Sequence, residues 1–176
     1  SAFRSGAAAA YDSVVDPVEG TILTALRETA DEMEFAVGFN PGDLGEIFQA
    51  SLRRCVIAVD NTTSQLAVLQ SAGVVDSGAQ GFALILDGMT QYLSGGGVRS
   101  ASIPTANLTG RVSEKFFTSA KAEIYGYCTQ FIINGSGLDV DLLRPKFSEV
   151  GESIVIIGDT QLLRVHGHVD DPEPLV

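Results

Sequence analysis

The sequence predicts an α+β protein in which an all-helical N-terminal part precedes a small α/β sandwich domain with β-α-β-β order. Apolar residues recur at helical spacing through residues 1–93. Glycine, serine and threonine then dominate residues 94–110, where no periodicity remains. Beyond this stretch, aromatic and β-branched residues cluster in short runs that are typical of strands. We therefore predict a helical part over 1–95, a linker over 96–112 and an α+β domain over 113–176.

Two long apolar stripes define the first helices. One follows Pro17, and the other follows the turn cluster "GFNPGD", in which Asp43 is a predicted N-cap with Glu46 three residues later. The stripes consist of Ile22, Leu23, Leu26, Ala30 and Met33, and of Leu44, Ile47, Phe48, Leu52, Val56 and Val59. Cys55 adjoins the second stripe, which predicts a position in the core.

A polar break at "DNTTSQ" precedes a short helix, and the loop "VVDSGAQG" (74–81) leads into the last helix of this part. In that last helix we expect the apolar residues to face inward: Phe82, Ile85, Leu86, Met89 and Leu93. Backbone N–H groups at a glycine-rich helix start can hold a phosphate. The simpler interpretation of the loop is a tight turn with Asp76 as the N-cap.

The C-terminal part combines strands with one short helix. The run "EIYGYCTQFII" (123–133) predicts a strand, and "NGSG" predicts a turn. A short helix is expected to begin near Asp139 or Asp141 and to end before Gly151. The run "SIVIIGDTQLLRVHGHV" (153–169) predicts two strands joined by a hairpin at "GDT". This order resembles part of a split β-α-β sandwich of the ferredoxin-like kind.

Composition excludes several classes of function. The net charge of −11 and the pI of about 4.4 argue against nucleic acid and anionic membranes as partners. No apolar run approaches the roughly 20 residues of a membrane span, and no signal-peptide pattern opens the sequence. Cys55 and Cys128 lie in different kinds of segment, so we expect two reduced thiols and a cytoplasmic location. The sequence begins without methionine in an apparent helix, and we expect a piece of a longer protein.

Both histidines of the chain, His166 and His168, lie in the last predicted strand. Residues two apart in a strand project from the same face, and Cys128 occupies the less apolar face of the earlier strand. If the two strands are neighbours, one thiolate and two imidazoles form a ligand set for zinc. Asp170 or Asp171 would then orient a histidine or supply a fourth ligand. The alternatives are an exposed sheet face followed by an acidic turn, and acid–base chemistry by the histidines.

Four stretches together resemble a known family. They are "AYDSVVDPVEGTILTALRE", "SAGVVDSGAQGFALILDGM", "YGYCTQFII" and "VHGHVDDP", which span nearly the whole chain. In this order they resemble the catalytic subunit of bacterial fatty acid kinase, which carries a dihydroxyacetone-kinase L-subunit-like domain at its front. The resemblance implies that the helical part is the back portion of a nucleotide-binding helical barrel, and that the C-terminal part is the family's middle domain.

The resemblance also implies an activity and its cofactors. The family transfers the γ-phosphoryl group of ATP to a fatty acid that a fatty acid-binding protein presents, which yields an acyl phosphate for phospholipid synthesis. "DSGAQG" is similar to the family's nucleotide loop, so Asp76, Ser77 and Gly78 are the expected nucleotide contacts. "GTIL" is similar to the segment that flanks the adenine or ribose, which implies contacts from Thr21 and Ile22, although the sugar kinases have Met in place of Ile.

One departure limits what the isolated chain is expected to do. The sequence contains no Gly-Asp-Gly-Asp loop, so the aspartates that hold magnesium in the family are missing and we expect this chain to be inactive by itself. The resemblance favours the zinc set, with a structural role that pins two strands together. The alternative function is a non-catalytic, metal-stabilised module for association or scaffolding. A half barrel would expose apolar surface, through which two copies would pair as a homodimer.

Overall fold

The described part of the chain forms two compact units. The computed structural model describes residues 2–97, 100 and 126–173. The helical unit contains 2–8 and the described residues from 18 to 100, and the sheet unit contains 9–17 and 126–173. The predicted linker over 96–112 lies almost entirely outside the described residues, as does the beginning of the first predicted strand.

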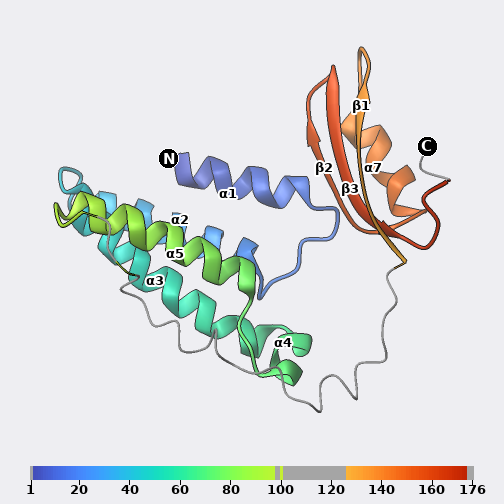
Figure 1. The fold of residues 1–176 in the computed structure, drawn as a ribbon. Helices are drawn as coiled ribbons and strands as arrows, with labels where there is room; N and C mark the ends of the chain where they lie inside the picture. Colours follow the sequence, from blue (N-terminus) through green and yellow to red (C-terminus); the bar gives the residue numbers. More distant parts are fainter. Residues whose placement is uncertain (1, 98–99, 101–125, 174–176) are drawn as a thin grey trace. The chain divides into compact units, whose positions relative to one another are not determined.

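In the residues that the structure describes, five helices precede a three-stranded sheet with one further helix (Figure 1). The elements in chain order are α1 (Ala2–Ser13), α2 (Ile22–Phe39), α3 (Leu44–Gln65), α4 (Ala67–Ala72), α5 (Ser77–Leu93), β1 (Tyr127–Asn134), α7 (Val140–Ser148), β2 (Glu152–Gly158) and β3 (Leu162–Val169). The α+β class and the β-α-β-β order are therefore confirmed. None of the described helices is both long and apolar enough to cross a membrane.

Polar side chains fix where the long helices begin. Asp43 caps α3, because its Oδ1 accepts the Glu46 N–H at 3.0 Å, as the sequence predicts. The polar break predicted at "DNTTSQ" is wrong, since α3 continues through these residues to Gln65. Thr62 lies in this stretch fully buried, and its hydroxyl donates to the Val59 carbonyl at 2.6 Å, which satisfies the side chain inside the helix.

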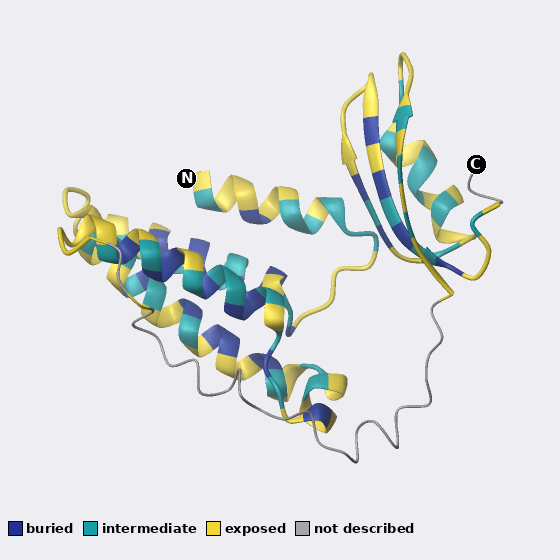
Figure 2. Ribbon diagram, in the orientation of Figure 1, coloured by how far each residue is buried: buried dark blue, intermediate teal, exposed yellow. Residues whose placement is uncertain are grey.

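The core of the helical unit lies between α2, α3 and α5 (Figure 2). Cys55 and Leu86 are both 0% exposed there, which confirms the core position predicted for the cysteine. The inward orientation predicted for Ile85, Met89 and Leu93 is wrong, because these side chains are 62%, 48% and 39% exposed. Helix α5 itself carries apolar residues on most of its sides, so periodicity alone did not identify its buried face. That face includes small residues such as Ala79 and Ala83, and small side chains let neighbouring helices approach closely.

The sheet has the strand order β1-β3-β2, and both outer strands run antiparallel to β3. Helix α7 connects β1 to β2, and these two strands flank β3. This is the split β-α-β arrangement expected from the sequence. One face of the sheet packs against α7 and forms the core of this unit. Its fully or nearly buried members are Ile154, Ile156, Leu163 and Val165.

An N-terminal segment belongs to the sheet unit. Val14 pairs with Val155 of β2, and the Val15 N–H donates to the Ile154 carbonyl at 3.2 Å. The Arg144 guanidinium of α7 donates to the Asp12 carbonyl at 2.6 Å. These bonds cover part of the outer edge of β2, whose backbone groups would otherwise face solvent.

Candidate functional site

The antiparallel register brings the three predicted metal ligands together. Cys128 of β1 lies directly opposite His168 of β3, and Gln130 lies opposite His166. One potential ligand atom from each of Cys128, His166 and His168 lies within 4.8 Å of the other two. All three side chains project from the face of the sheet opposite α7, since alternate residues of β3 are buried on the α7 side.

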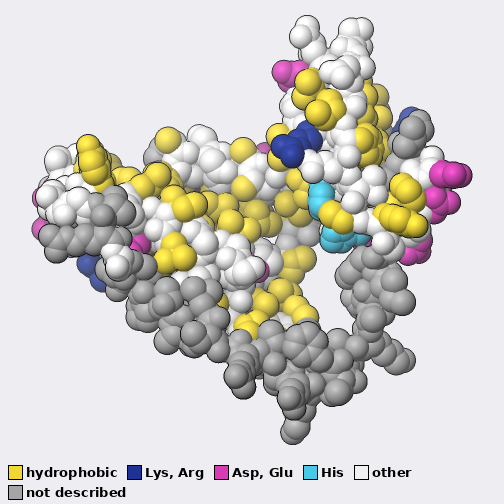
Figure 3. All heavy atoms as spheres, viewed as in Figure 1, with side chains coloured by type: hydrophobic (Ala, Val, Ile, Leu, Met, Phe, Trp, Pro, Cys, Tyr) yellow, Lys and Arg dark blue, Asp and Glu magenta, His cyan; other side chains and the backbone are white. Residues whose placement is uncertain are grey.

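This spacing is close to what a zinc ion requires. Tetrahedral zinc with Zn–S of about 2.3 Å and Zn–N of about 2.0 Å separates its ligand atoms by roughly 3.3–3.5 Å. Small side-chain rotations therefore suffice to close the site, and the two imidazole rings already lie with centroids 5.4 Å apart. Cys128 is exposed and both histidines are half-buried, so the site opens to solvent (Figure 3). A thiolate with two imidazoles is a donor set that suits zinc.

Two glycines let the strands that carry the ligands approach closely. A Cβ atom at Gly126, just before β1, would lie 2.9 Å from the Val169 carbonyl oxygen at the end of β3. Gly167 is buried between the two histidines, and a Cβ there would overlap Cδ1 of Ile154 in the core. Both positions therefore require the absence of a side chain, and this requirement fixes the backbone around the site.

The acidic residues near the site differ from those expected. Neither Asp170 nor Asp171 joins the ligand cluster among the described residues, and the Asp171 carboxylate instead accepts the Glu173 N–H at 3.0 Å. The register places Glu152 of β2 opposite His168. Sequence reasoning missed Glu152 because a bulge, with Ser153 at φ 54°, sets this register. No local pattern reports such a bulge.

The two cysteines have opposite environments. Cys128 is exposed on the open face of the sheet, whereas Cys55 is enclosed in the helical core. Burial raises the pKa of the Cys55 thiol above its ordinary value, because a thiolate is poorly solvated there. Cys55 is therefore unsuited to metal binding or nucleophilic chemistry.

The predicted nucleotide residues lie together at the adjoining starts of α2 and α5. A Cβ built on Gly78 would lie 3.3 Å from Cβ of Ile22, so the first turns of the two helices are in contact. Asp76 caps α5, since its Oδ2 accepts the Ala79 N–H at 2.8 Å. Thr21 caps α2, and its hydroxyl also donates to the Val18 carbonyl at 2.8 Å. Both caps thus serve their own helices, and Ser77 begins α5 beside them.

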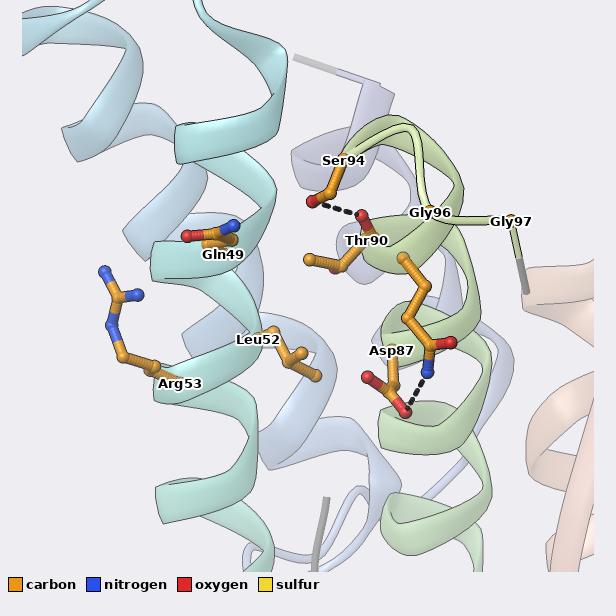
Figure 4. Close-up of a pocket in the computed structure, with 9 residues that line it drawn as sticks. Gln49, Leu52, Arg53, Asp87, Thr90, Ser94, Gly96 and Gly97 are labelled. Atoms are coloured by element: carbon orange, nitrogen blue, oxygen red, sulfur yellow. Dashed lines mark hydrogen bonds between the residues drawn. The ribbon is translucent and has the colours of Figure 1, made fainter. Parts of the chain in front are cut away.

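A pocket of about 480 Å³ lies at the opposite end of α5 (Figure 4). Gln49, Leu52 and Arg53 of α3 line one side, and Asp87 and Thr90 of α5 line the other. The carboxylate of Asp87 is 1% exposed and accepts a hydrogen bond from the Gln91 amide at 3.0 Å. Sequence reasoning missed this pocket, although Asp87 is the single charged residue in the run 77–93.

Two family models match the chain in succession. A model of the DAK2 domain matches residues 1–91, and a model of the FakA-like middle domain of fatty acid kinase matches residues 124–176. The chain therefore belongs to the DAK2-domain family and carries the FakA-like middle domain behind the DAK2 region.

Similar proteins occur in staphylococci. An uncharacterized protein of Staphylococcus saprophyticus is 33% identical over 178 aligned residues, which cover 97% of this chain and 32% of that protein. Uncharacterized proteins of Staphylococcus epidermidis and Staphylococcus aureus are 32% identical over the same shares of both chains. The chain thus spans about a third of the length of the curated relatives that it matches.

Proposed function

We propose that this chain is the segment of an ATP-dependent fatty acid kinase that joins the back of the nucleotide domain to the middle domain. The observation that carries the proposal is the succession of a DAK2 region and a FakA-like middle domain along one chain. In the reaction, a fatty acid carboxylate oxygen bonds to the γ-phosphorus of ATP while the bond to the β-phosphate oxygen breaks. ADP and an acyl phosphate result, and we expect a fatty acid-binding protein to present the substrate in the cytoplasm.

The helical unit would contribute one wall of the nucleotide site. The starts of α2 and α5 lie in contact, so the positive ends of two helix dipoles point to the same region. Phosphate oxygens would accept from N–H groups in the first turn of α5, at Ser77 and Gly78, while Thr21 and Ile22 would flank the base or ribose. Magnesium, which neutralises the developing charge in such reactions, would be held by residues outside this sequence.

The sheet unit would carry a zinc ion on Cys128, His166 and His168. The proximity of the three ligand atoms supports this proposal. When bound, zinc would link β1 to β3 through one ligand on the first strand and two on the second, and it would retain a fourth position for another ligand.

A matched pair of cap variants tests the nucleotide role. The protein as isolated from its source cell would be given ATP and a fatty acid on its binding protein, and acyl phosphate would be trapped with hydroxylamine. Asp76→Ala and Asp43→Ala each remove an N-cap hydrogen bond and should each cost about 1 kcal/mol of stability. Only Asp76→Ala should raise the KM for ATP. Equal effects of the two variants, or no acyl phosphate from the unaltered protein, would contradict the proposal.

A second function, association without catalysis, is favoured by one observation. Helix α5 exposes Ile85, Met89 and Tyr92, the last at 72%, on positions three and four residues apart. Such a stripe would pair two copies of the chain. Light scattering of both the isolated chain and the protein from the source cell distinguishes the two functions. A homodimer in both samples favours association. A homodimer of the isolated chain alone reflects apolar surface that the rest of a kinase would cover.

A further inference from the structure

The face of the sheet that bears the ligand cluster also bears a cation. Arg164 lies two residues before His166 on β3, so both side chains project from the open face with Cα atoms about 6.7 Å apart. The Arg164 side chain is exposed. Figure 3 shows a basic side chain beside the two histidines on this surface.

Gln130 holds this guanidinium in place. With its amide turned so that the oxygen faces β3, Gln130 accepts hydrogen bonds from both Nε and Nη2 of Arg164. Gln130 is itself the register partner of His166, which places the glutamine, the arginine and the histidine side by side. The rest of the guanidinium edge remains available for a ligand, because Arg carries five N–H donors.

No carboxylate forms an ion pair with Arg164 among the residues that the structure describes. Other arginines do form them: Arg4 contacts Asp31 at 2.6 Å, and Arg27 contacts Glu19 at 2.9 Å. The chain has 22 acidic and 11 basic residues, so carboxylates are abundant, yet the side chain that holds this cation is an amide. It leaves the positive charge of Arg164 available for an anion from outside the chain.

Exposed apolar side chains border the same cation. The register partners of Arg164 are Ile132 on β1 and Ile157 on β2, which are 59% and 57% exposed. Leu162, two residues earlier on β3, is 45% exposed. Along the open face, the ligand cluster is therefore followed by Arg164 and then by an aliphatic strip formed by Ile132, Ile157 and Leu162. A molecule with an anionic head and a hydrocarbon tail matches this sequence of groups.

We propose that the open face binds an anionic amphiphile, whose carboxylate or phosphate head bridges the zinc ion and Arg164 and whose alkyl chain lies over Ile132 and Ile157. The inference deepens the proposed function and rests on the zinc site proposed above. The three ligands and Arg164 lie on the same face of the sheet, so an oxyanion in the fourth position of the zinc ion would have the guanidinium on its own side of the sheet. Gln130 acts as a positioning residue for the arginine.

Titration calorimetry on the zinc-loaded 176-residue chain tests the proposal, with acetate, octanoate and octyl phosphate as probes. Octanoate should bind at least tenfold more tightly than acetate, because each buried CH₂ adds up to about fourfold in affinity. Octanoate and octyl phosphate have alkyl chains of similar length, so a comparison of their affinities shows whether the site prefers a carboxylate or a phosphate. Ile132→Ser should weaken octanoate and leave acetate unchanged.

Charge variants locate the head. Arg164→Gln should retain one zinc per chain and weaken octanoate at least tenfold, and Gln130→Ala should weaken it less. Lys146→Gln removes the same charge from α7, on the other side of the sheet, and should change affinity by less than twofold. If the zinc-loaded chain binds none of the probes, or if Arg164→Gln binds octanoate with unchanged affinity, this proposal is overturned while the zinc site is not. A chain that takes up no zinc overturns the metal site and this proposal with it.

Discussion

Removal of the proposed zinc ion should destabilise the sheet unit by an amount comparable with the unit's own stability. Domains are stabilised by about 0.05–0.15 kcal/mol per residue, so a unit of roughly 60 residues has about 3–9 kcal/mol. A ligand that binds only the folded state adds about 2.7 kcal/mol at a free concentration one hundred times its Kd. In so small a unit, this difference corresponds to a shift in Tm of about 10–20 °C.

Differential scanning calorimetry, with zinc content measured by mass spectrometry, checks this prediction. Zinc should raise the Tm of the sheet unit in the unaltered chain, and EDTA should reverse the effect. Cys128→Ser should contain little zinc and should not respond to EDTA. Because Cys128 is exposed, the substitution itself should cost little packing energy. The transition of the helical unit serves as the internal control. Zinc content that Cys128→Ser leaves unchanged, or a metal-dependent shift below about 2 °C, would refute the reasoning.

Three further predictions concern individual side chains. A thiol reagent at neutral pH should label the native chain at Cys128 alone and zinc should block this labelling, whereas Cys55 should react only after unfolding because burial raises its pKa and hides it. Leu86→Ala should lower the free energy of unfolding, measured by urea denaturation, by about 2–5 kcal/mol, whereas Ile85→Ala on the exposed side of α5 should cost less than about 1 kcal/mol. Two backbone N–H groups hold the pKa of Asp159 below its ordinary value, so this carboxylate stabilises the hairpin above about pH 4 and the contribution is lost on acidification. Asp159→Asn should flatten the acid limb of the Tm–pH profile, and an unchanged profile would contradict this assignment.

Local patterns were sufficient to predict the element types, two N-caps and the face shared by the three proposed metal ligands. Asp43 and Asp76 cap helices because their carboxylates reach the N–H three residues on, a purely local geometry. The alternation of a strand was enough to place His166 and His168 on one face, and the hairpin signal paired β2 with β3. Only the pairing of β1 with β3 then remained to bring Cys128 to the histidines.

The features that sequence analysis missed depend on contacts between distant segments. Val14 pairs with Val155, and no local pattern marks an isolated bridge between residues so far apart in the chain. The neighbour of His168 on β2 is Glu152 because of the bulge at Ser153, which shifts the register by one residue. The buried face of α5 depends on which neighbours it packs against, since both sides of this helix are apolar.

The two faces of the sheet bear on the role of the proposed zinc site. The α7 side already holds β1, β2 and β3 together through a buried aliphatic core, which includes Leu163 and Val165 at 0% and 1% exposure. A metal needed only to fix the strands would have its ligands enclosed and four in number. Here three ligands converge on the opposite, solvent-facing side, with Arg164 held beside them. Stabilisation by zinc and binding of an anion are therefore separable properties of one site, and Arg164→Gln is the substitution that should remove the second while it leaves the first intact.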